Sequence, residues 1–333
     1  MAFMRTDVVI VGAGVVGLTT AARLAERRPG VRISIYADHL GEETNSYAAG
    51  AIFDPHMAEH PRRDLWARMT HTELHRCHRN GEPWVRFLRG MEASRTHLAS
   101  PPSWALDLPG YRECDPADLP AGFATGWHYE APLVDMPLYL DWLGRRSAAA
   151  EVPVHRRRLE TLEEAFDSTA IVVNCSGIGA SSLVPDGSMQ PMRGQLVKVS
   201  NPGIHEFFVE YPAAPDMGES TYILPQGDSL LLGGNAEKGE PEPVPDPVVA
   251  AGILERCRGV FPQLASAGVL EHRVGIRPRR SEVRLEHEDL GDRHIVHNYG
   301  HGGSGVSLAW GCADDVADIV LSLLDAGIGC SNV

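Results

Sequence analysis

The stretch Asp7-Val8-Val9-Ile10-Val11-Gly12-Ala13-Gly14-Val15-Val16-Gly17 decides the fold of this chain. After its first residue it begins with a run of β-branched apolar side chains, which is typical of a strand covered on both faces of a parallel sheet. Apolar residues then recur at helical spacing from Val15 to Arg28, and Val31 to Tyr36 has the composition of a second strand. The segment therefore predicts a βαβ unit.

The three glycines of this stretch have the spacing of a dinucleotide-binding turn. Gly12 would permit the tight turn, Gly14 would let the backbone approach a pyrophosphate, and Gly17 would allow close contact between helix and strand. Asp38 follows the second strand, 21 positions after Gly17, where a carboxylate can hold a ribose. The pattern predicts a dinucleotide site, with a purely structural glycine turn as the alternative, and it does not choose between NAD and FAD.

A second glycine cluster, His301-Gly302-Gly303-Ser304-Gly305, precedes an amphipathic helix expected from Val306 to Leu324. It supplies a second set of free amides at the positive end of a helix. Since one pyrophosphate needs only one such cradle, we expect the second to face a flavin ring, so that FAD would span both ends of the chain. An NAD-dependent dehydrogenase would leave this cluster unexplained, and a surface glycine loop is the other alternative.

Composition narrows the class of protein. A chain of 333 residues with 43% hydrophobic and 22% charged residues is long enough for two folded lobes. Its formal charge of -14 disfavours nucleic acid as a partner. No apolar run reaches the roughly 18 to 20 residues of a membrane span, and no signal peptide is recognised, so the expected location is the cytoplasm.

Cysteine and histidine spacing gives no reason to expect a metal. The six cysteines are scattered without a CxxC pair and are interpreted as reduced thiols. His56 with His60, and His71 with His75, are spaced four apart, but neither pair has a recognisable third ligand. We interpret these histidines as a polar helix face and loop, within a helix predicted from Arg63 to His78.

Further strands are expected later in the chain. The run Ala170 to Cys175 resembles another strand of the first sheet, returning after a long excursion. Four shorter runs separated by turn residues indicate an antiparallel sheet; they are residues 195–200, 207–210, 221–225 and 229–232.

Seven segments occur in the order seen in D-amino acid and D-aspartate oxidases, and over nearly its whole length the chain resembles that family. The segments are Tyr36-Ala37-Asp38, Ala48-Ala49-Gly50, Val173-Asn174-Cys175-Ser176-Gly177, Arg193-Gly194-Gln195, Tyr222-Ile223-Leu224-Pro225 with Gly233-Gly234, Val274-Gly275-Ile276-Arg277-Pro278, and His297-Asn298-Tyr299-Gly300-His301-Gly302-Gly303.

The resemblance implies an α/β fold with two domains. One is a discontinuous, Rossmann-like FAD-binding domain built on the βαβ unit and its GxGxxG turn. The other is a substrate-binding domain with a large mixed, mainly antiparallel sheet. The expected boundaries give residues 1–55, 145–192 and 275–333 to the FAD domain and residues 56–144 and 193–274 to the substrate domain.

The resemblance also implies a substrate site. Arg277 matches the arginine that binds the substrate carboxylate, and a planar guanidinium suits that task because it donates two parallel hydrogen bonds. Tyr222 matches the tyrosine whose hydroxyl contacts the same carboxylate, and the carbonyl of Gly303 would accept from the substrate amine. The alternatives are a surface salt-bridging arginine and a core tyrosine.

The remaining residues implied by the resemblance would hold FAD. The expected contacts are pyrophosphate and ribose at one end and the flavin at the other, with the backbone of Leu159 holding the adenine. The cofactor-binding set is Gly12, Gly14, Val15, Val16, Gly17, Ala37, Asp38, His39, Thr44, Asn45, Ser46, Ala49, Gly50, Leu159, Ser176, Gly177, Arg277, Gly302, Gly303, Ser304, Gly305, Val306 and Ser307.

The chain departs from the vertebrate pattern of the family near the substrate. Gly218 stands where a second pocket tyrosine is expected, and the loop Ala213 to Ser220 would form a different lid. Ala236 stands where D-aspartate oxidases carry an arginine, which argues against acidic substrates, while His56 is a candidate for shaping the pocket.

We therefore expect FAD-dependent oxidative deamination of D-amino acids with neutral or hydrophobic side chains, with dioxygen as electron acceptor. The alternatives are a same-fold oxidase of glycine, D-aspartate or a specialised biosynthetic amino acid, and a flavin-binding protein without turnover. The expected partners are the small-molecule substrate and dioxygen, with no nucleic acid and no membrane, and a homodimer is a candidate assembly.

Overall fold

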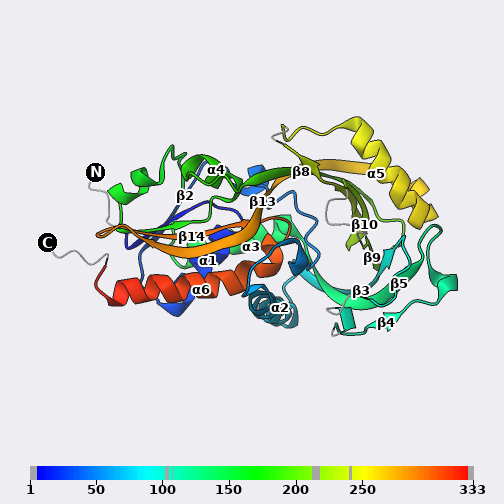
Figure 1. The fold of residues 1–333 in the computed structure, drawn as a ribbon, viewed down its shortest axis with the longest axis horizontal. Coiled ribbons are helices and arrows are strands. Elements are labelled where there is room, and N and C mark those ends of the chain that lie inside the picture. The colour runs from blue at the N-terminus through cyan, green and yellow to red at the C-terminus, as the bar shows by residue number, and fades with distance from the viewer. Residues whose placement is uncertain (1–5, 102–104, 107, 212–217, 240–241, 329–333) are drawn as a thin grey trace.

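The computed structural model describes residues 6–101, 105–106, 108–211, 218–239 and 242–328. A single 14-stranded sheet runs through the described chain in the order β4-β5-β3-β9-β10-β11-β8-β13-β14-β7-β1-β2-β6, with β12 paired to β8. Figure 1 shows the sheet extending from a helix-covered half on the left to a curled half on the right.

The left half is the predicted βαβ unit enlarged to five strands. β1 (Val8–Val11) pairs in parallel with β2 (Ile33–Ala37) and with β7 (Ile171–Asn174). β14 (His294–His301) and β6 (Val154–Arg156) extend the parallel sheet at its two sides. The carboxyl ends of β1, β2 and β7 therefore lie at one edge, where ligands bind in open α/β sheets.

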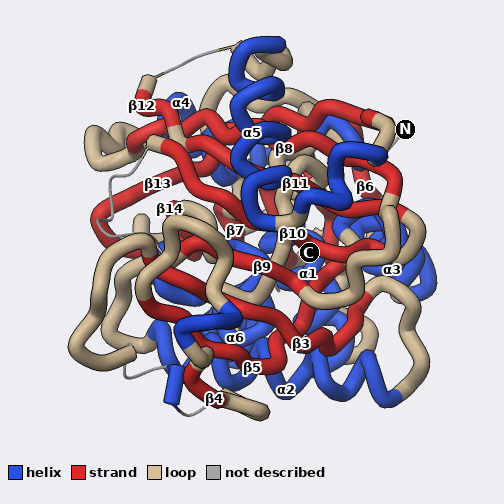
Figure 2. The backbone as a smooth tube through the Cα atoms, turned by 90° about the vertical axis from the view of Figure 1, so that its right-hand side faces the viewer, coloured by secondary structure: helices blue, strands red, loops and turns tan. Residues whose placement is uncertain are grey.

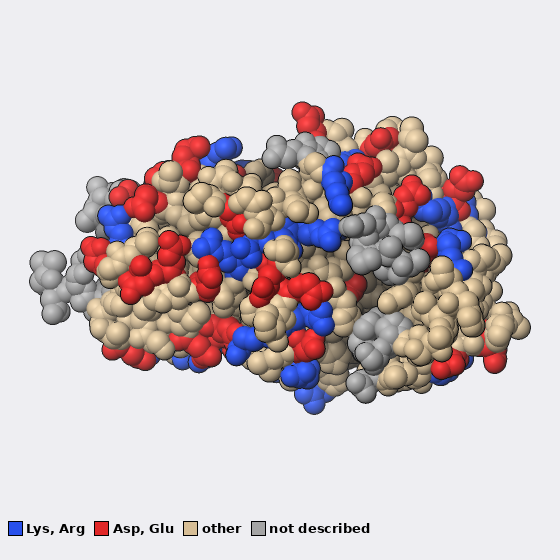
Figure 3. Space-filling view, in the orientation of Figure 1, with Lys and Arg blue, Asp and Glu red and all other residues tan. Residues whose placement is uncertain are grey.

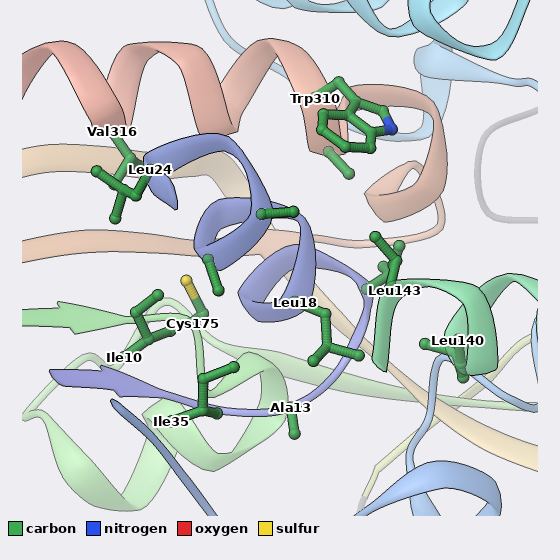
Figure 4. Packing of buried hydrophobic residues seen from close by; sticks show 14 of the residues in the cluster. Ile10, Ala13, Leu18, Leu24, Ile35, Leu140, Leu143, Cys175, Trp310 and Val316 are labelled. Carbon is green, nitrogen blue, oxygen red and sulfur yellow. The ribbon is translucent and has the colours of Figure 1, made fainter. Parts of the chain in front are cut away.

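Helix α1 (Val15–Arg27) lies between this sheet and two other helices, α3 (Met136–Ala149) and α6 (Gly305–Asp325). Figure 4 shows Leu24 meeting Val316 of α6 and Leu18 meeting Leu143 of α3. All four side chains are buried, and burial of apolar surface of this kind is the main stabilising contribution to the fold.

Helix α2 (Arg63–Arg79) packs on α6 although the two are far apart in sequence. Trp66 and Leu308 share a buried cluster, and Trp66 Nε1 donates to Asp315 Oδ2 at 2.7 Å. Gly311 permits this approach, because a Cβ on it would meet the Cα and carbonyl oxygen of Trp66. Residues 63–79, which were expected in the substrate domain, therefore contact the C-terminal helix directly.

The right half of the sheet contains the predicted short strands and several that the sequence did not indicate. It is mainly antiparallel, as expected, with one parallel pair between β3 and β9. Its strands are β3 (Val85–Ser94), β4 (Arg112–Glu113), β5 (Thr125–Val134), β8 (Gln190–Ser200), β9 (Phe207–Glu210), β10 (Glu219–Gln226), β11 (Ser229–Asn235) and β12 (Glu237–Lys238).

The two faces of this half have different environments. Phe208, Ile223 and Leu232 pack against α5 (Pro247–Val260), which Figure 2 shows lying across the outer face in front of β8 and β11. Phe207 and Leu231 belong to a separate cluster on the opposite, inner face. Side chains alternate between these clusters along each strand, as the two-residue period requires.

Strand β13 (Val269–Asp289) joins the two halves of the sheet. It pairs with β8 over residues 269–279 and with β14 over residues 279–289, with a register shift between Arg279 and Arg284. The expected domain boundary between residues 274 and 275 therefore falls inside β13, and the one between residues 144 and 145 falls inside α3.

Short elements complete the chain. They are η1 (Gly41–Glu43), η2 (Pro55–Met57), η4 (Pro116–Asp118), η5 (Leu162–Asp167), η6 (Gly177–Gly179), α4 (Ala180–Leu183) and η7 (Pro262–Ser266).

The described surface carries both signs of charge. On the face shown in Figure 3, acidic residues are spread along the whole length of the molecule and basic residues are interspersed among them. Within the described residues, no helix has the length and apolarity needed to cross a membrane.

The close packing of α2 on α6 gives a test of the fold. Replacing Gly311 with Ala should lower the free energy of unfolding by about 1–3 kcal/mol, because the new methyl group overpacks the contact with Trp66. Gly259→Ala is the matched control: it lies in α5 with nothing within 4 Å, and it should raise stability by about 0.4–1 kcal/mol. Urea titration of both variants measures the two signs, and equal effects would contradict the packing described.

Candidate active site

The first glycine turn has the geometry of a phosphate cradle. Gly12 has φ +112°, and a Cβ there would collide with the carbonyl of Cys175. A Cβ on Gly17 would collide with the carbonyl of Gly12. Both positions therefore require glycine, as the sequence predicted, because only glycine permits this approach of turn, helix and strand.

The N-terminus of α1 is open to an anion. Gly14 is its N-cap and supplies no side-chain cap, and the first turn contains no acidic residue. The hydroxyl of Ser46 accepts the Val15 N–H at 2.9 Å, so one amide of this first turn already has a protein partner. This arrangement fits the pyrophosphate of FAD, since free amides at the positive end of a helix favour negative charge.

The predicted ribose and adenine contacts lie at the neighbouring strand ends. Ala37 ends β2, and Asp38 follows it with an exposed carboxylate that contacts His39 Nδ1 at 2.8 Å. Leu159 follows β6, the parallel partner of β2, and its buried side chain packs in a cluster with Tyr36.

Ser176 and Gly177 lie on the other side of the turn, directly after β7. Ser176 donates its N–H and its hydroxyl to Asn174 Oδ1, at 3.2 and 2.6 Å. Its Cα would lie 3.2 Å from a Cβ on Gly12. Ser176 therefore borders the cradle, while its hydroxyl is engaged by Asn174.

Residues 44–50 connect the cradle with the curled half of the sheet. Thr44 donates to the carbonyl of Gly41 at 2.7 Å, and Asn45 Oδ1 accepts the Ile276 N–H at 2.8 Å. Since both side chains already have protein partners, their predicted contacts with FAD stay a prediction. The Asn45 bond instead ties this loop to β13 one residue before Arg277.

The second glycine cluster lies beside the first. β14 ends at His301, Gly302 has φ +55°, and α6 begins at Gly305. A Cβ on Gly305 would lie 4.0 Å from Cγ1 of Val15, so the N-termini of α6 and α1 are neighbours. The first turn of α6 contains no acidic residue. Two positive helix ends therefore meet at one site, which a cofactor with a pyrophosphate and an anionic reduced ring would use.

The N-terminus of α6 also binds residues 54–57, which follow the loop formed by residues 44–50. The hydroxyl of Ser307 accepts the Asp54 N–H at 2.8 Å, and that of Ser304 accepts the Met57 N–H at 3.1 Å. A Cβ on Gly303 would lie 2.7 Å from Sδ of Met57. The segment 54–57, which the sequence singled out only through His56, thus covers the glycine cluster.

His56 and His301 flank this contact. His56 is partly buried in η2, and burial lowers its pKa. His301 is fully enclosed, burial lowers its pKa to about 4, and its Nε2 has no hydrogen-bond partner among the described residues. His301, the last residue of β14, is therefore neutral at neutral pH and lies directly before Gly302.

Arg277 and Tyr222 lie together over glycines. The guanidinium of Arg277 covers Gly194 of β8, where a Cβ would collide with Cζ and Nη1. Tyr222 lies directly opposite Gly233 of β11, and a Cβ on Gly50 would lie 3.3 Å from Cε2 of its ring. Glycines at positions 194, 233 and 50 therefore leave the space that the side chains of Arg277 and Tyr222 occupy.

Contacts behind these two residues fix their position. Arg277 Nη1 donates to the carbonyl of Asn235 at 3.0 Å, and Asn235 Oδ1 accepts the Gln195 N–H at 2.7 Å. Burial raises the pKa of the Tyr222 phenol, and the charge of Arg277 opposes that shift. Asn235 was not identified from the sequence, because its link to Arg277 uses a backbone carbonyl that any residue could supply.

The structure describes only part of the predicted lid, the loop Ala213 to Ser220, but it describes Gly218 and Ala236. Residues 213–217 lie outside the described residues. Gly218 accepts the Ala236 N–H at 2.7 Å, so the two positions at which the chain departs from the family pattern are neighbours.

Comparison with known proteins confirms the resemblance. A sequence model of the family described as FAD dependent oxidoreductase matches residues 7–319. The D-amino-acid oxidase of Streptomyces coelicolor is 46% identical over 93% of this chain and 95% of its own length. The D-amino-acid oxidase of Rubrobacter xylanophilus is 42% identical over 93% of this chain and 94% of its own length. Human D-aspartate oxidase is 33% identical, covering 96% of each chain.

Solved structures share the fold. Glycine oxidase from Geobacillus kaustophilus has a TM-score of 0.79 and 19% sequence identity, covering 96% of this chain and 95% of that one. L-α-glycerophosphate oxidase from Mycoplasma pneumoniae with FAD bound has a TM-score of 0.74 and 15% identity, covering 96% of this chain and 95% of that one. With its open helix N-termini and obligatory glycines, the chain belongs to the D-amino-acid oxidase family of FAD-dependent oxidoreductases.

Proposed function

We propose that this enzyme oxidises the α-carbon of D-amino acids, giving 2-oxo acids, ammonia and hydrogen peroxide with dioxygen as electron acceptor. The names of the two most identical relatives described above support this reaction. The observation that carries it is the pair Arg277 and Tyr222, fixed over glycines beside the two helix N-termini that fit FAD.

Arg277 and Tyr222 bind the substrate carboxylate. One guanidinium nitrogen donates to Asn235, and the other N–H groups are suited to a carboxylate, which pairs with a guanidinium through two parallel bonds. Because burial raises the pKa of Tyr222, its hydroxyl stays protonated at neutral pH and donates a further bond. The stereochemistry of the reaction depends on which face of the α-carbon is directed at the flavin when Arg277 and Tyr222 hold the carboxylate.

The carbonyl of Gly303 accepts from the substrate amine and so fixes the third substituent of the α-carbon. When bound, FAD would accept the hydride and then pass its two electrons to dioxygen, giving hydrogen peroxide. With carboxylate and amine both held, the protein acts mainly by orientation, which can account for a large part of the rate enhancement without a side-chain base.

The proposed FAD site uses the residues inferred from the family. Gly12, Gly14 and the first turn of α1 hold the pyrophosphate, and Asp38 holds the ribose. The amides of Gly305, Val306 and Ser307 face the pyrimidine end of the flavin. The neighbouring N-termini of α1 and α6 support a single cofactor lying across both.

The first experiment is a visible spectrum of the purified protein, followed by anaerobic mixing with D- and L-amino acids. Loss of the flavin band near ~450 nm with D-amino acids alone supports the proposal, because the cofactor itself reports the hydride transfer. A flavin band that only L-amino acids bleach, or that no amino acid bleaches, would reject it.

Replacing Arg277 tests the carboxylate grip. Arg277→Ala should raise KM for D-amino acids roughly 30-fold or more, because it removes one partner of a hydrogen-bonded charge pair. Arg277→Lys should recover only part of this, since an ammonium cannot donate the two parallel bonds. Steady-state kinetics measure both variants, and the flavin spectrum should stay unchanged. An unaltered KM in Arg277→Ala would refute the assigned role.

The close contact between Gly194 and Arg277 gives an independent test in which no polar residue is replaced. Gly194→Ala should displace the guanidinium of Arg277, lowering kcat/KM by about tenfold or more while FAD stays bound. Gly144→Ala is the matched control, because nothing lies within 4 Å of its Cβ position, and its kinetics should equal those of the parent enzyme. Parent-like kinetics in both variants would contradict the placement of Arg277.

A cytoplasmic location and a homodimer belong to the same proposal. The five described cysteines are all free thiols, which supports a reducing compartment. Light scattering after size-exclusion chromatography tests the homodimer by its mass.

A further inference from the structure

The inner face of the curled sheet carries a buried carboxylate on the same face as Tyr222. Tyr222 of β10 lies opposite Val209 of β9, and Val209 in turn lies opposite Glu92 of β3. Residues directly opposite in neighbouring strands project to the same face. Glu92 is therefore two strands from Tyr222, roughly 10 Å away in backbone terms.

Glu92 is enclosed but lacks a counter-charge. It is 5% exposed, and it accepts one hydrogen bond from the hydroxyl of Tyr129 at 3.0 Å. Within the described parts of the chain, no Arg, Lys or His side chain forms an ion pair with Glu92. Burial therefore favours the neutral, protonated form of Glu92, and a cation placed beside it would stabilise the carboxylate.

A charged residue that acts on Glu92 has the same sign. Asp54, on the segment held by Ser307, repels Glu92, and this repulsion adds to burial in raising the pKa of Glu92 to about 8. Two carboxyl groups therefore interact, one on β3 and one beside the glycine cluster. A cation bound near them would relieve their repulsion.

A second polar group on this face also lacks a partner. Trp127 lies opposite Glu92 on β5 and is fully buried, and its Nε1 has no hydrogen-bond partner among the described residues. A buried indole N–H normally finds an acceptor. The apolar and aromatic side chains of the inner face include Phe207, Leu224 and Leu231.

We propose that Glu92 is a specificity-determining residue whose carboxylate binds the terminal cation of a substrate side chain, so that the enzyme prefers basic D-amino acids such as D-lysine and D-arginine. This inference rests on the proposed function, because it requires the substrate carboxylate to lie at Arg277 and Tyr222. The sequence led us to expect substrates with neutral side chains. The proposal instead gives the side chain apolar neighbours along its length and an acidic residue at its end.

The length of a basic side chain suits this arrangement. Lysine carries its charge on a flexible four-carbon stem, which can lie along apolar surface while its ammonium reaches a polar group. A neutral side chain of the same length would contact the apolar residues and leave Glu92 without a counter-charge. Sites built to bind a charged group reject analogues that lack it.

The decisive measurement compares D-lysine with D-norleucine, which has a similar stem and no charge. In the parent holoenzyme, kcat/KM should be higher for D-lysine. Glu92→Gln should lower it roughly 10- to 100-fold for D-lysine, in line with the loss of a hydrogen bond to a charged group, and leave D-norleucine within about twofold. A parent enzyme that prefers D-norleucine, or a variant that loses both substrates equally, would overturn the proposal.

Two variants separate recognition from structure. Glu92→Asp keeps the charge and should retain the preference for D-lysine over D-norleucine. Glu210→Gln is the matched control, because Glu210 is also 5% exposed and lies on the neighbouring strand but faces the opposite side, where it pairs with Arg95. It should not change the ratio of the two substrates. If it changes the ratio as much as Glu92→Gln does, the effect is structural and the proposal fails.

Binding of two unreactive carboxylates distinguishes failure of the subsite from failure of the proposed reaction. 6-Aminohexanoate and hexanoate lack an α-amine, so their affinity can be read from the shift of the flavin band without turnover. The parent should bind 6-aminohexanoate more tightly, and Glu92→Gln should abolish the difference. If no D-amino acid is oxidised while this difference persists, only the proposed reaction fails. If the parent binds 6-aminohexanoate and hexanoate equally, the proposed subsite is rejected. This measurement needs only the parent enzyme, so it decides the question even if Glu92→Gln does not fold.

Discussion

The pairing of β13 with β8 along its first part and with β14 along its second is the constraint on which the rest of the site depends. It makes one sheet out of a nucleotide-binding half and a curled half. Arg277 lies two residues before the strand changes partner, and the Gly302 N–H donates to Pro278 at that point. The proposed substrate-binding residue is thereby fixed relative to the glycine cluster by strand pairing.

Asn45 strengthens the same connection from the other direction. Its side chain accepts the Ile276 N–H, while the adjacent Ser46 accepts the Val15 N–H at the start of α1. Neighbouring residues of one loop thus bind both β13 and the start of α1. Orientation contributes to catalysis only when the groups that hold the reactants cannot drift apart, and these two hydrogen bonds supply that rigidity.

Much of this architecture could be predicted from the sequence, because glycine spacing and apolar periodicity report local geometry directly. The βαβ unit, α2, α6 and the shorter antiparallel strands were predicted at nearly their observed positions. The continuity of the sheet was not, since it depends on which strand β13 pairs with at each end. Non-local pairing of this kind leaves no periodic trace in a single segment.

The site shows the same division between what is local and what is not. Gly12, Gly17 and Gly302 were identified because a turn with positive φ or a close backbone approach needs glycine at a fixed place in a motif. Asn235 and Asp54 were missed, because each is brought to the site by the tertiary fold and contacts it through a backbone group that any residue could supply. The carboxylate of Asp54 acts on Glu92, which is also distant in sequence. The family resemblance supplied Arg277 and Tyr222, which spacing alone would have left as an ordinary arginine and a core tyrosine.

Strand β3 shows why a failed prediction can itself be informative. Its outer face has Met91 and Ala93, but its inner face has Gly90 and Glu92, so the apolar alternation that signals a strand is broken on the side that faces the substrate region. Gly90 is explained by packing, because the ring of Phe207 occupies the place of its side chain. Glu92 has no such packing explanation, because the hydrogen bond that it accepts from Tyr129 provides no counter-charge. Where local consistency fails without a structural reason, a functional one is expected, and on this face the function is recognition of a substrate side chain.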